Sequence, residues 1–364
     1  MTFLRNIVLY IVMLGVIVTL HELGHLLAAK AFGVYCKEFS FGFGPKLLSK
    51  KGKETEYCLR AIPLGGFVAM AGDTDNSLET KVDIPDLPEE RTLIGIARWK
   101  RVIIMMAGIM MNILLAIFIY SMMILSTGAY AESTKPAIVE VLPDSPALKA
   151  GLKAGDIITK AGFENGLSIA PDTYVELITF LDTYDGNGPW IITVDRNSEK
   201  ISFDIYPEYK EENQRYMIGI SFSNQAVKVV DVNIFNCWKY GFKYSMFILK
   251  MTFSSLMTLF QGKNLNQVSG PIGIYSTVSQ SVELGFEYYL QLIAMISINV
   301  GVINAFPLPI FDGGRVFLLL IELIIGRPLS EKAQNIIMSA SMVLLLMLFA
   351  LVMYNDISKI ILGG

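Results

Sequence analysis

The fold is decided by residues 5–30, RNIVLYIVMLGVIVTLHELGHLLAAK. The apolar run from Ile7 to Leu20 is too short to cross a bilayer core about 30 Å thick, which needs roughly 20 helical residues. At about 1.5 Å per residue, the helix must continue through the polar residues 21–25 to about Ala29. Those polar residues are therefore expected inside a membrane-spanning helix. A cleavable signal peptide is the alternative, but two histidines and a glutamate interrupt the run.

The chain has two histidines, and they lie four residues apart in the sequence His21-Glu22-Leu23-Gly24-His25. This spacing on a helix brings both imidazoles to one face, where they can bind one metal ion. Glu22 then lies beside them as a base for a water molecule. The alternative is a buried polar cluster whose hydrogen bonds are satisfied by neighbouring helices.

A catalytic zinc ion usually has three protein ligands, so a third ligand must come from another segment at membrane depth. Asp312 is the best candidate, because Pro307 and Pro309 precede it and break an apolar stretch. Broken helix within a membrane is tolerated where it lines a cavity or packs on protein. The alternative role for Asp312 is a helix cap after the prolines. Glu322 is a weaker candidate for the third ligand.

The composition is that of a membrane protein, because 53% of the residues are hydrophobic, 17% are charged and the mean hydropathy is +0.49. Besides the first span, three apolar runs are long enough to cross a membrane: 102–126, 290–306 and 336–354. The run 290–306 contains Asn299 and Asn304, and polar residues in a span are often functional. No surface for nucleic acid is indicated.

The loop between the first two spans is basic, which favours a cytoplasmic location for it. Its basic residues include Lys46, Lys50, Lys51, Lys53, Arg60, Arg91, Arg98 and Lys100. With four spans, both termini and residues 131–232 are then expected on the other side of the membrane.

Two extramembrane segments have the composition of β structure. Residues 39–43 and 56–60 flank a turn rich in lysine and glycine, which predicts a β-hairpin closed by Gly65-Gly66. From Lys135 to about Val232, short β-type runs, the last from Met217 to Ser221, predict one small soluble domain. Within this domain, residues 144–158 (DSPALKAGLKAGDII) resemble a stretch of bacterial PDZ domains.

The two membrane motifs together resemble those of the site-2 proteases, specifically the bacterial regulator-of-sigma-E protease group. Residues 21–25 match the zinc motif of that family, and residues 304–313 (NAFPLPIFDG) resemble its N-x-x-P-x-P-x-x-D-G motif at the same spacing. Further similar stretches are Phe41–Pro45, Ile62–Phe67, Val268–Gly273 and Tyr354–Ile357. The sequence departs from the family at Ile109, where proline is common, and in having one PDZ-like segment where some relatives have two.

The resemblance implies one zinc ion per chain, held by His21, His25 and Asp312, with Glu22 as the general base. It also implies that Asn304 lies near the substrate carbonyl. The hairpin is expected to dip into the membrane and to align an unfolded substrate strand by β-addition. The residues expected to contact the substrate are Phe41, Gly42, Gly65, Gly66, Asn299 and Pro307. For the two asparagines, the alternative is hydrogen bonding between helices.

The expected architecture is a polytopic α-helical membrane protein with about four transmembrane helices, a membrane-associated β-hairpin and an inserted PDZ-like α/β domain. Its expected divisions are a first transmembrane helix (1–34), the hairpin region (35–72), a cytoplasmic loop (73–98), a second transmembrane helix (99–130), the PDZ-like domain (131–232), an amphipathic region (233–284), a third transmembrane helix with the proline motif (285–326), and a fourth transmembrane helix with a tail (327–364). Within the amphipathic region, residues 238–260 are expected to lie on the membrane and not to span it, because three lysines interrupt them.

These features predict an intramembrane zinc metalloprotease of the bacterial cytoplasmic membrane that performs regulated intramembrane proteolysis. Its expected partners are the lipid bilayer and single-span membrane proteins, such as an anti-sigma factor, or signal-peptide remnants. No nucleic-acid partner is expected. The alternative is a PDZ-bearing membrane scaffold or chaperone with a non-catalytic metal site. A soluble-type zinc peptidase on a membrane anchor would need ligands in the extramembrane domain, which contains no histidine.

Overall fold

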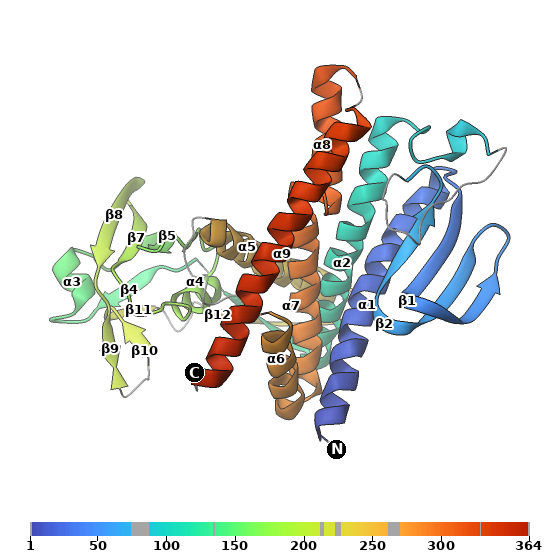
Figure 1. Cartoon of the computed structure of the whole chain (residues 1–364). Helices are drawn as coiled ribbons and strands as arrows, with labels where there is room; N and C mark the ends of the chain where they lie inside the picture. The colour runs from blue at the N-terminus through green and yellow to red at the C-terminus, as the bar shows by residue number, and fades with distance from the viewer. Residues whose placement is uncertain are drawn as a thin grey trace. The chain divides into compact units, whose positions relative to one another are not determined.

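The computed structural model describes residues 2–73, 87–133, 135–211, 215–222, 227–260, 270–327 and 329–362 (Figure 1). Residues 74–86 of the predicted cytoplasmic loop lie outside this part of the chain. The chain forms two compact units, one of residues 1–120 with 268–364 and the other of residues 121–267.

The first unit is built from long helices and one β-hairpin. Its helices are α1 (Thr2–Ala31), α2 (Arg98–Thr127, which continues into the second unit), α6 (Pro271–Leu284), α7 (Phe286–Asn304), α8 (Asp312–Ile325) and α9 (Glu331–Leu362), with a short 3-10 helix at Glu89–Arg91. Among the described helices, α1, α2, α7 and residues Lys332–Ser358 of α9 are long and apolar enough to cross a membrane. These four candidate spans correspond to the four predicted ones.

The segment between α7 and α8 breaks where the prolines predict a break. Pro307 and Pro309 have no N–H to donate and disfavour helical geometry in the residues before them. The broken segment then folds back on the start of α8, so that a Cβ at Gly313 would overlap the carbonyl of Ala305, and one at Gly314 that of Leu308. Glycines at these two positions let the loop place the first residue of α8 beside α1.

The hairpin consists of β1 (Cys36–Lys51) and β2 (Glu56–Met70), drawn in light blue beside α1 in Figure 1. Its register places Phe39 opposite both Val68 and Tyr57, so the first part of β1 lies between the two ends of β2. The predicted end at Gly65-Gly66 is wrong, because β2 continues to Met70. Its last residues reach the apolar core between α1 and α2, where Val68 and Met70 are buried.

An aspartate of α9 caps α6. The carboxylate of Asp356 accepts hydrogen bonds from the backbone N–H groups of Gly270 (3.0 Å), Ile272 (3.1 Å) and Gly273 (2.9 Å). Pro271 lies among these donors and has no N–H of its own, as is common at the first position of a helix. Two stretches that resemble family motifs, near residues 270 and 356, therefore meet here; Val268 and Ser269 lie outside the described residues.

The second unit contains a four-stranded antiparallel sheet in the order β6-β5-β7-β8. Its strands are β3 (Ala129–Ser133), β4 (Ile138–Val141), β5 (Ile157–Phe163), β6 (Ser168–Ile169), β7 (Trp190–Arg196), β8 (Glu199–Ile205), β9 (Glu208–Lys210), β10 (Arg215–Met217), β11 (Ile220–Phe222) and β12 (Val227–Asp231). Its helices are α3 (Pro146–Ala150), α4 (Tyr174–Leu181) and α5 (Cys237–Phe260). Alternate residues of the sheet pack on α4, with Phe163 stacked on Phe180 at 4.6 Å between ring centroids.

Helix α5 covers the predicted interfacial segment and is not among the candidate spans of the described residues. Lys250 forms an ion pair with Asp172 (2.6 Å), and the Ser254 hydroxyl donates to the carbonyl of Ser168 (2.9 Å). These contacts attach one side of the helix to the rest of the second unit.

A buried ion pair holds residues 151–156 of the second unit to its sheet. The carboxylate of Asp156, which is 1% exposed, accepts two hydrogen bonds from the guanidinium of Arg196, both of 2.7 Å. It also accepts one from the N–H of Lys153 (2.9 Å). Burial alone would raise the pKa of Asp156, but these donors outweigh it and hold the pKa below its usual value.

We expect the substitution Asp156→Asn to destabilise the second unit by about 2 kcal/mol, because it removes charge-assisted hydrogen bonds. In the wild type, the contribution of this carboxylate should be fully present well above the unfolded-state pKa of about 3.9 and should be lost as the pH falls toward the lower folded-state pKa. Hydrogen exchange of peptides from β5 and β7, followed in the full-length protein, measures both effects. If wild type and variant lost protection identically from pH 7 to pH 3, the ion pair would contribute no stability.

Candidate metal centre

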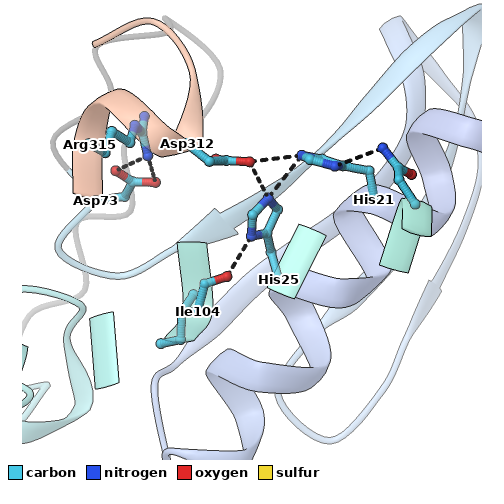
Figure 2. Close-up of polar contacts among 7 residues, drawn as sticks. His21, His25, Asp73, Ile104, Asp312 and Arg315 are labelled. Atoms are coloured by element: carbon cyan, nitrogen blue, oxygen red, sulfur yellow. Dashed lines mark hydrogen bonds and ion pairs between the residues drawn. The ribbon is translucent and has the colours of Figure 1, made fainter. Parts of the chain in front are cut away.

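Three potential ligand atoms meet within the first unit, and Figure 2 shows them. Nε2 of His21 lies 2.9 Å from Oδ2 of Asp312 and 3.2 Å from Nε2 of His25. Nε2 of His25 lies 3.3 Å from the same carboxylate oxygen. The structure therefore brings together the two histidines and the aspartate that the sequence analysis selected.

The spacing of these atoms fits a tetrahedral zinc site. Zinc–nitrogen bonds of about 2.0–2.1 Å separate neighbouring tetrahedral ligands by roughly 3.3 Å, and the three atoms lie 2.9–3.3 Å apart. Two imidazole nitrogens and one carboxylate oxygen are also the donor set of many catalytic zinc sites. Both histidines are 6% exposed, so the protein surrounds their rings.

Each ligand is positioned by a local feature of its helix. His21 and His25 are one turn apart on α1 and face α2, with their rings at an edge-to-face angle of 83°. Asp312 is the first residue of α8, and the folded proline loop before it directs its carboxylate toward α1.

Helix α2 provides the outer contacts of the imidazoles. Nδ1 of His25 donates to the carbonyl of Ile104 (2.8 Å), because a carbonyl can only accept. The Nε2 lone pair of His25 is then directed at the metal position. Gly108 lies between the two rings, and a Cβ at this position would be 2.5 Å from Nε2 of His25. Only glycine lets α2 approach this closely.

A cavity of about 370 Å³ lies over the three ligands. Glu22 and Asn304, the two residues expected to act on the substrate, both line it. Of the residues expected to contact the substrate, Gly66 lines the cavity, together with its neighbours Phe67 and Val68. The cavity is apolar along β2 and polar around the three ligand atoms.

The other residues expected at the substrate do not line this cavity, namely Phe41, Gly42, Gly65, Asn299 and Pro307. Phe41 instead packs against α1, where a Cβ at Gly15 would be 3.0 Å from its ring. The competing ligand Glu322 lies at the far end of α8 and accepts a hydrogen bond from the N–H of Leu329 (2.9 Å). It caps the turn into α9.

Several residues of the site were not selected from the sequence. Arg315 and Asp73 line the cavity and form an ion pair of 3.3 Å that joins α8 to the segment after β2 (Figure 2). Arg315 could have been found, because it follows Asp312 by three residues and so shares its helix face. Asn112, a polar residue within an apolar helix, also carried a signal. Nothing in the sequence marks Ile104, whose backbone carbonyl is the group used.

A second group of potential ligands lies in the hairpin, where atoms of Glu38, Glu56 and Cys58 are close together. Lys46 forms ion pairs with both glutamates (3.0 and 2.8 Å), and Arg60 with Glu38 (2.8 Å). These cations already neutralise the carboxylates, so the group is an ion-pair network of the sheet.

The family model of peptidase family M50 matches residues 9–348, which include all three potential ligands. The chain belongs to peptidase family M50. This M50 peptidase is similar to a Clostridium acetobutylicum protein classed with the zinc metalloproteases, with 33% identity over 354 residues and 97% of each chain covered. It is also similar to the zinc metalloprotease RasP of Geobacillus kaustophilus, with 29% identity and 98% of each chain covered.

A further relative is the regulator of sigma-W protease RasP of Bacillus subtilis, with 26% identity over 432 residues, covering 99% of this chain and all of the relative. The M50 peptidase is thus a zinc-dependent metalloendopeptidase of the site-2 protease family and a membrane protein. The expectation of a zinc cofactor is confirmed, and the scaffold alternative is not supported.

Proposed function

We propose that this M50 peptidase cleaves peptide bonds within the transmembrane segments of single-span membrane proteins, with one zinc ion held by His21, His25 and Asp312. The observation that carries the proposal is the place of the ligands. Two of them lie within α1, a helix of 30 residues that is apolar enough to cross a membrane. A peptide must therefore enter the membrane-embedded part of the protein to reach the metal.

Zinc, when bound, polarises the substrate carbonyl and acidifies a water molecule. Glu22 lies next to His21 in the sequence and lines the cavity over the ligands, so it is placed to take a proton from that water. The same carboxyl group then returns the proton to the leaving amine. Asn304 lines the cavity at the end of α7, and its amide N–H can donate to the carbonyl oxygen of the cleaved bond.

The end of β2 is suited to hold the substrate as an extended strand. Residues 66–70 pair with Cys36–Phe41 on one side, and within the described residues no strand pairs with their other side. Gly66, Phe67 and Val68 line the cavity. A substrate strand added at this edge would present its backbone to the ligands, and the hairpin is proposed to dip into the membrane to meet it.

The relatives and the predicted topology support the proposed substrate class. One relative is named as a regulator of sigma-W protease, which favours a membrane-tethered anti-sigma factor as substrate, with signal-peptide remnants as the second candidate. We propose that the basic loop after α1 faces the cytoplasm of a bacterial cell. Residues 131–232 would then form a PDZ-like domain on the extracytoplasmic side.

The full-length protein in proteoliposomes tests the proposal with a single-span reporter protein as substrate. We expect cleavage within the apolar segment of the reporter, mapped by mass spectrometry of the products. The zinc chelator 1,10-phenanthroline should lower the rate at least 100-fold, and added zinc should restore it. Cleavage confined to the soluble flanks of the reporter would contradict intramembrane proteolysis. Cleavage that resists chelation would contradict the role of zinc.

A further inference from the structure

Asn112 lies in the middle of α2 and is fully buried, at 0% exposure. Its side-chain nitrogen Nδ2 is 3.2 Å from Nδ1 of His21, and its side-chain oxygen Oδ1 has no hydrogen-bond partner among the described residues. A buried amide oxygen without a partner is unusual and destabilises the folded protein. The amide therefore has an unused acceptor beside a metal-binding imidazole.

The hydrogen-bonding requirement of His21 changes when a metal binds. Its Nε2 faces Asp312 and His25, so the lone pair of Nε2 must be directed at the metal. A neutral imidazole then carries its proton on Nδ1 and needs an acceptor there. A half-turn of the Asn112 amide places Oδ1 opposite this N–H. Because Oδ1 has no hydrogen-bond partner among the described residues, this rotation of the amide breaks no hydrogen bond of that oxygen.

The other imidazole already shows this arrangement. Nδ1 of His25 donates to the carbonyl of Ile104, also on α2. Ile104 and Asn112 are eight residues apart, about two turns of one helix face, and Gly108 lies midway between them against both rings. A single face of α2 thus supplies one neighbour to each histidine.

We propose that Asn112 is a positioning residue for the metal, and that its amide oxygen accepts the Nδ1 proton of His21 when zinc is bound. The inference rests on the proposed ligands His21, His25 and Asp312. The hydrogen bond holds the imidazole of His21 in the tautomer and orientation that zinc requires. Outer partners of this kind contribute about 10- to 100-fold in metal affinity.

Hydrogen bonding between α2 and α7 does not account for the Asn112 side chain. The polar contact between α2 and α7 at this depth is made by Ser297, whose hydroxyl donates to the backbone carbonyl of Asn112 at 2.8 Å. The side-chain amide takes no part in it. Ser297 is also fully buried, which makes it a matched control for helix packing.

The test is the zinc affinity of the purified full-length protein, measured by competition with a chromophoric chelator. Asn112→Leu keeps the size of the side chain but removes the acceptor, and we expect 10- to 100-fold weaker binding. Asn112→Asp keeps an acceptor and should bind zinc at least as tightly as the wild type. Ser297→Ala removes the contact between helices and should stay within about threefold of the wild type. Thermal unfolding of each zinc-free variant reports its folding.

The inference is overturned if Asn112→Leu binds zinc like the wild type, or if Asn112→Asp is as weak as Asn112→Leu. It is also overturned if Ser297→Ala loses as much affinity as Asn112→Leu, because the effect would then be one of helix packing. A failure of the ligand assignment is a different result: His21→Ala would then retain the zinc affinity of the wild type.

Discussion

The substitution Glu22→Gln should lower the rate of peptide cleavage by roughly 10³-fold while zinc remains bound. A positioned general base contributes about 10²- to 10⁴-fold, and glutamine has the same shape but cannot take a proton from water. Glu22 lines the cavity, whereas the proposed ligand atoms belong to His21, His25 and Asp312. Cleavage of the single-span reporter and zinc content, both measured on the same preparation, give the two values.

The matched control is Glu322→Gln, because Glu322 is a buried glutamate of α8 outside the cavity. Its side-chain oxygen accepts the N–H of Leu329, and glutamine keeps such an acceptor. This variant should retain cleavage within a few-fold and should retain zinc. A Glu22→Gln protein that cleaves at the wild-type rate would falsify the proposed mechanism. Loss of zinc from Glu322→Gln would reopen the choice of the third ligand.

The substitution Gly108→Ala should abolish tight zinc binding, with an affinity at least 100-fold below that of the wild type. A Cβ at this position would be 2.5 Å from Nε2 of His25 and 2.8 Å from Cε1 of His21. Carbon and nitrogen atoms do not approach so closely, so both rings must move or α2 must withdraw. Either movement spoils a geometry that tolerates only a few tenths of an ångström.

Gly301→Ala is the control for Gly108→Ala, because this glycine of α7 also faces α2. Its nearest neighbours would be the Cβ of Asn112 and the carbonyl of Ile109, both at 3.6 Å, which is an ordinary contact distance. This variant should bind zinc like the wild type in the same chelator competition. Equal zinc affinity in Gly108→Ala and the wild type would show that α2 can withdraw without cost to the site.

The clustering of His21, His25 and Asp312 could be predicted from the sequence because each part depends on local geometry. Helix periodicity alone puts His21 and His25 on one face, and the prolines before Asp312 indicate a break in a membrane-spanning helix. The contribution of α2 could not be predicted in the same way. Ile104 acts through its backbone carbonyl, which its residue type does not reveal. Glycine is needed at position 108 because α2 lies close to α1, and the spacing of residues within one helix does not reveal the distance between two helices.

The bounds of two predicted strands also could not be read correctly from the sequence. The run Met217–Ser221 reads as one strand, but the structure has β10 ending at Met217 and β11 starting at Ile220, with different partners. Gly219 between them has a φ of +78°, a left-handed turn that glycine adopts readily. The opposite error was made for β2, whose predicted end lies before its actual end. Gly65 and Gly66 read as a terminator, yet pairing with Phe41 carries the strand through them.

The cap on α6 sets an order of events during synthesis. Gly270 and Asp356 are 86 residues apart, which a ribosome needs on the order of ten seconds to translate. Until then the first turn of α6 has N–H groups without their carboxylate, and the helix cannot settle against α9. His21, His25 and Asp312 all precede Asp356 in the chain, so the three clustered side chains are synthesised before the cap on α6 can form.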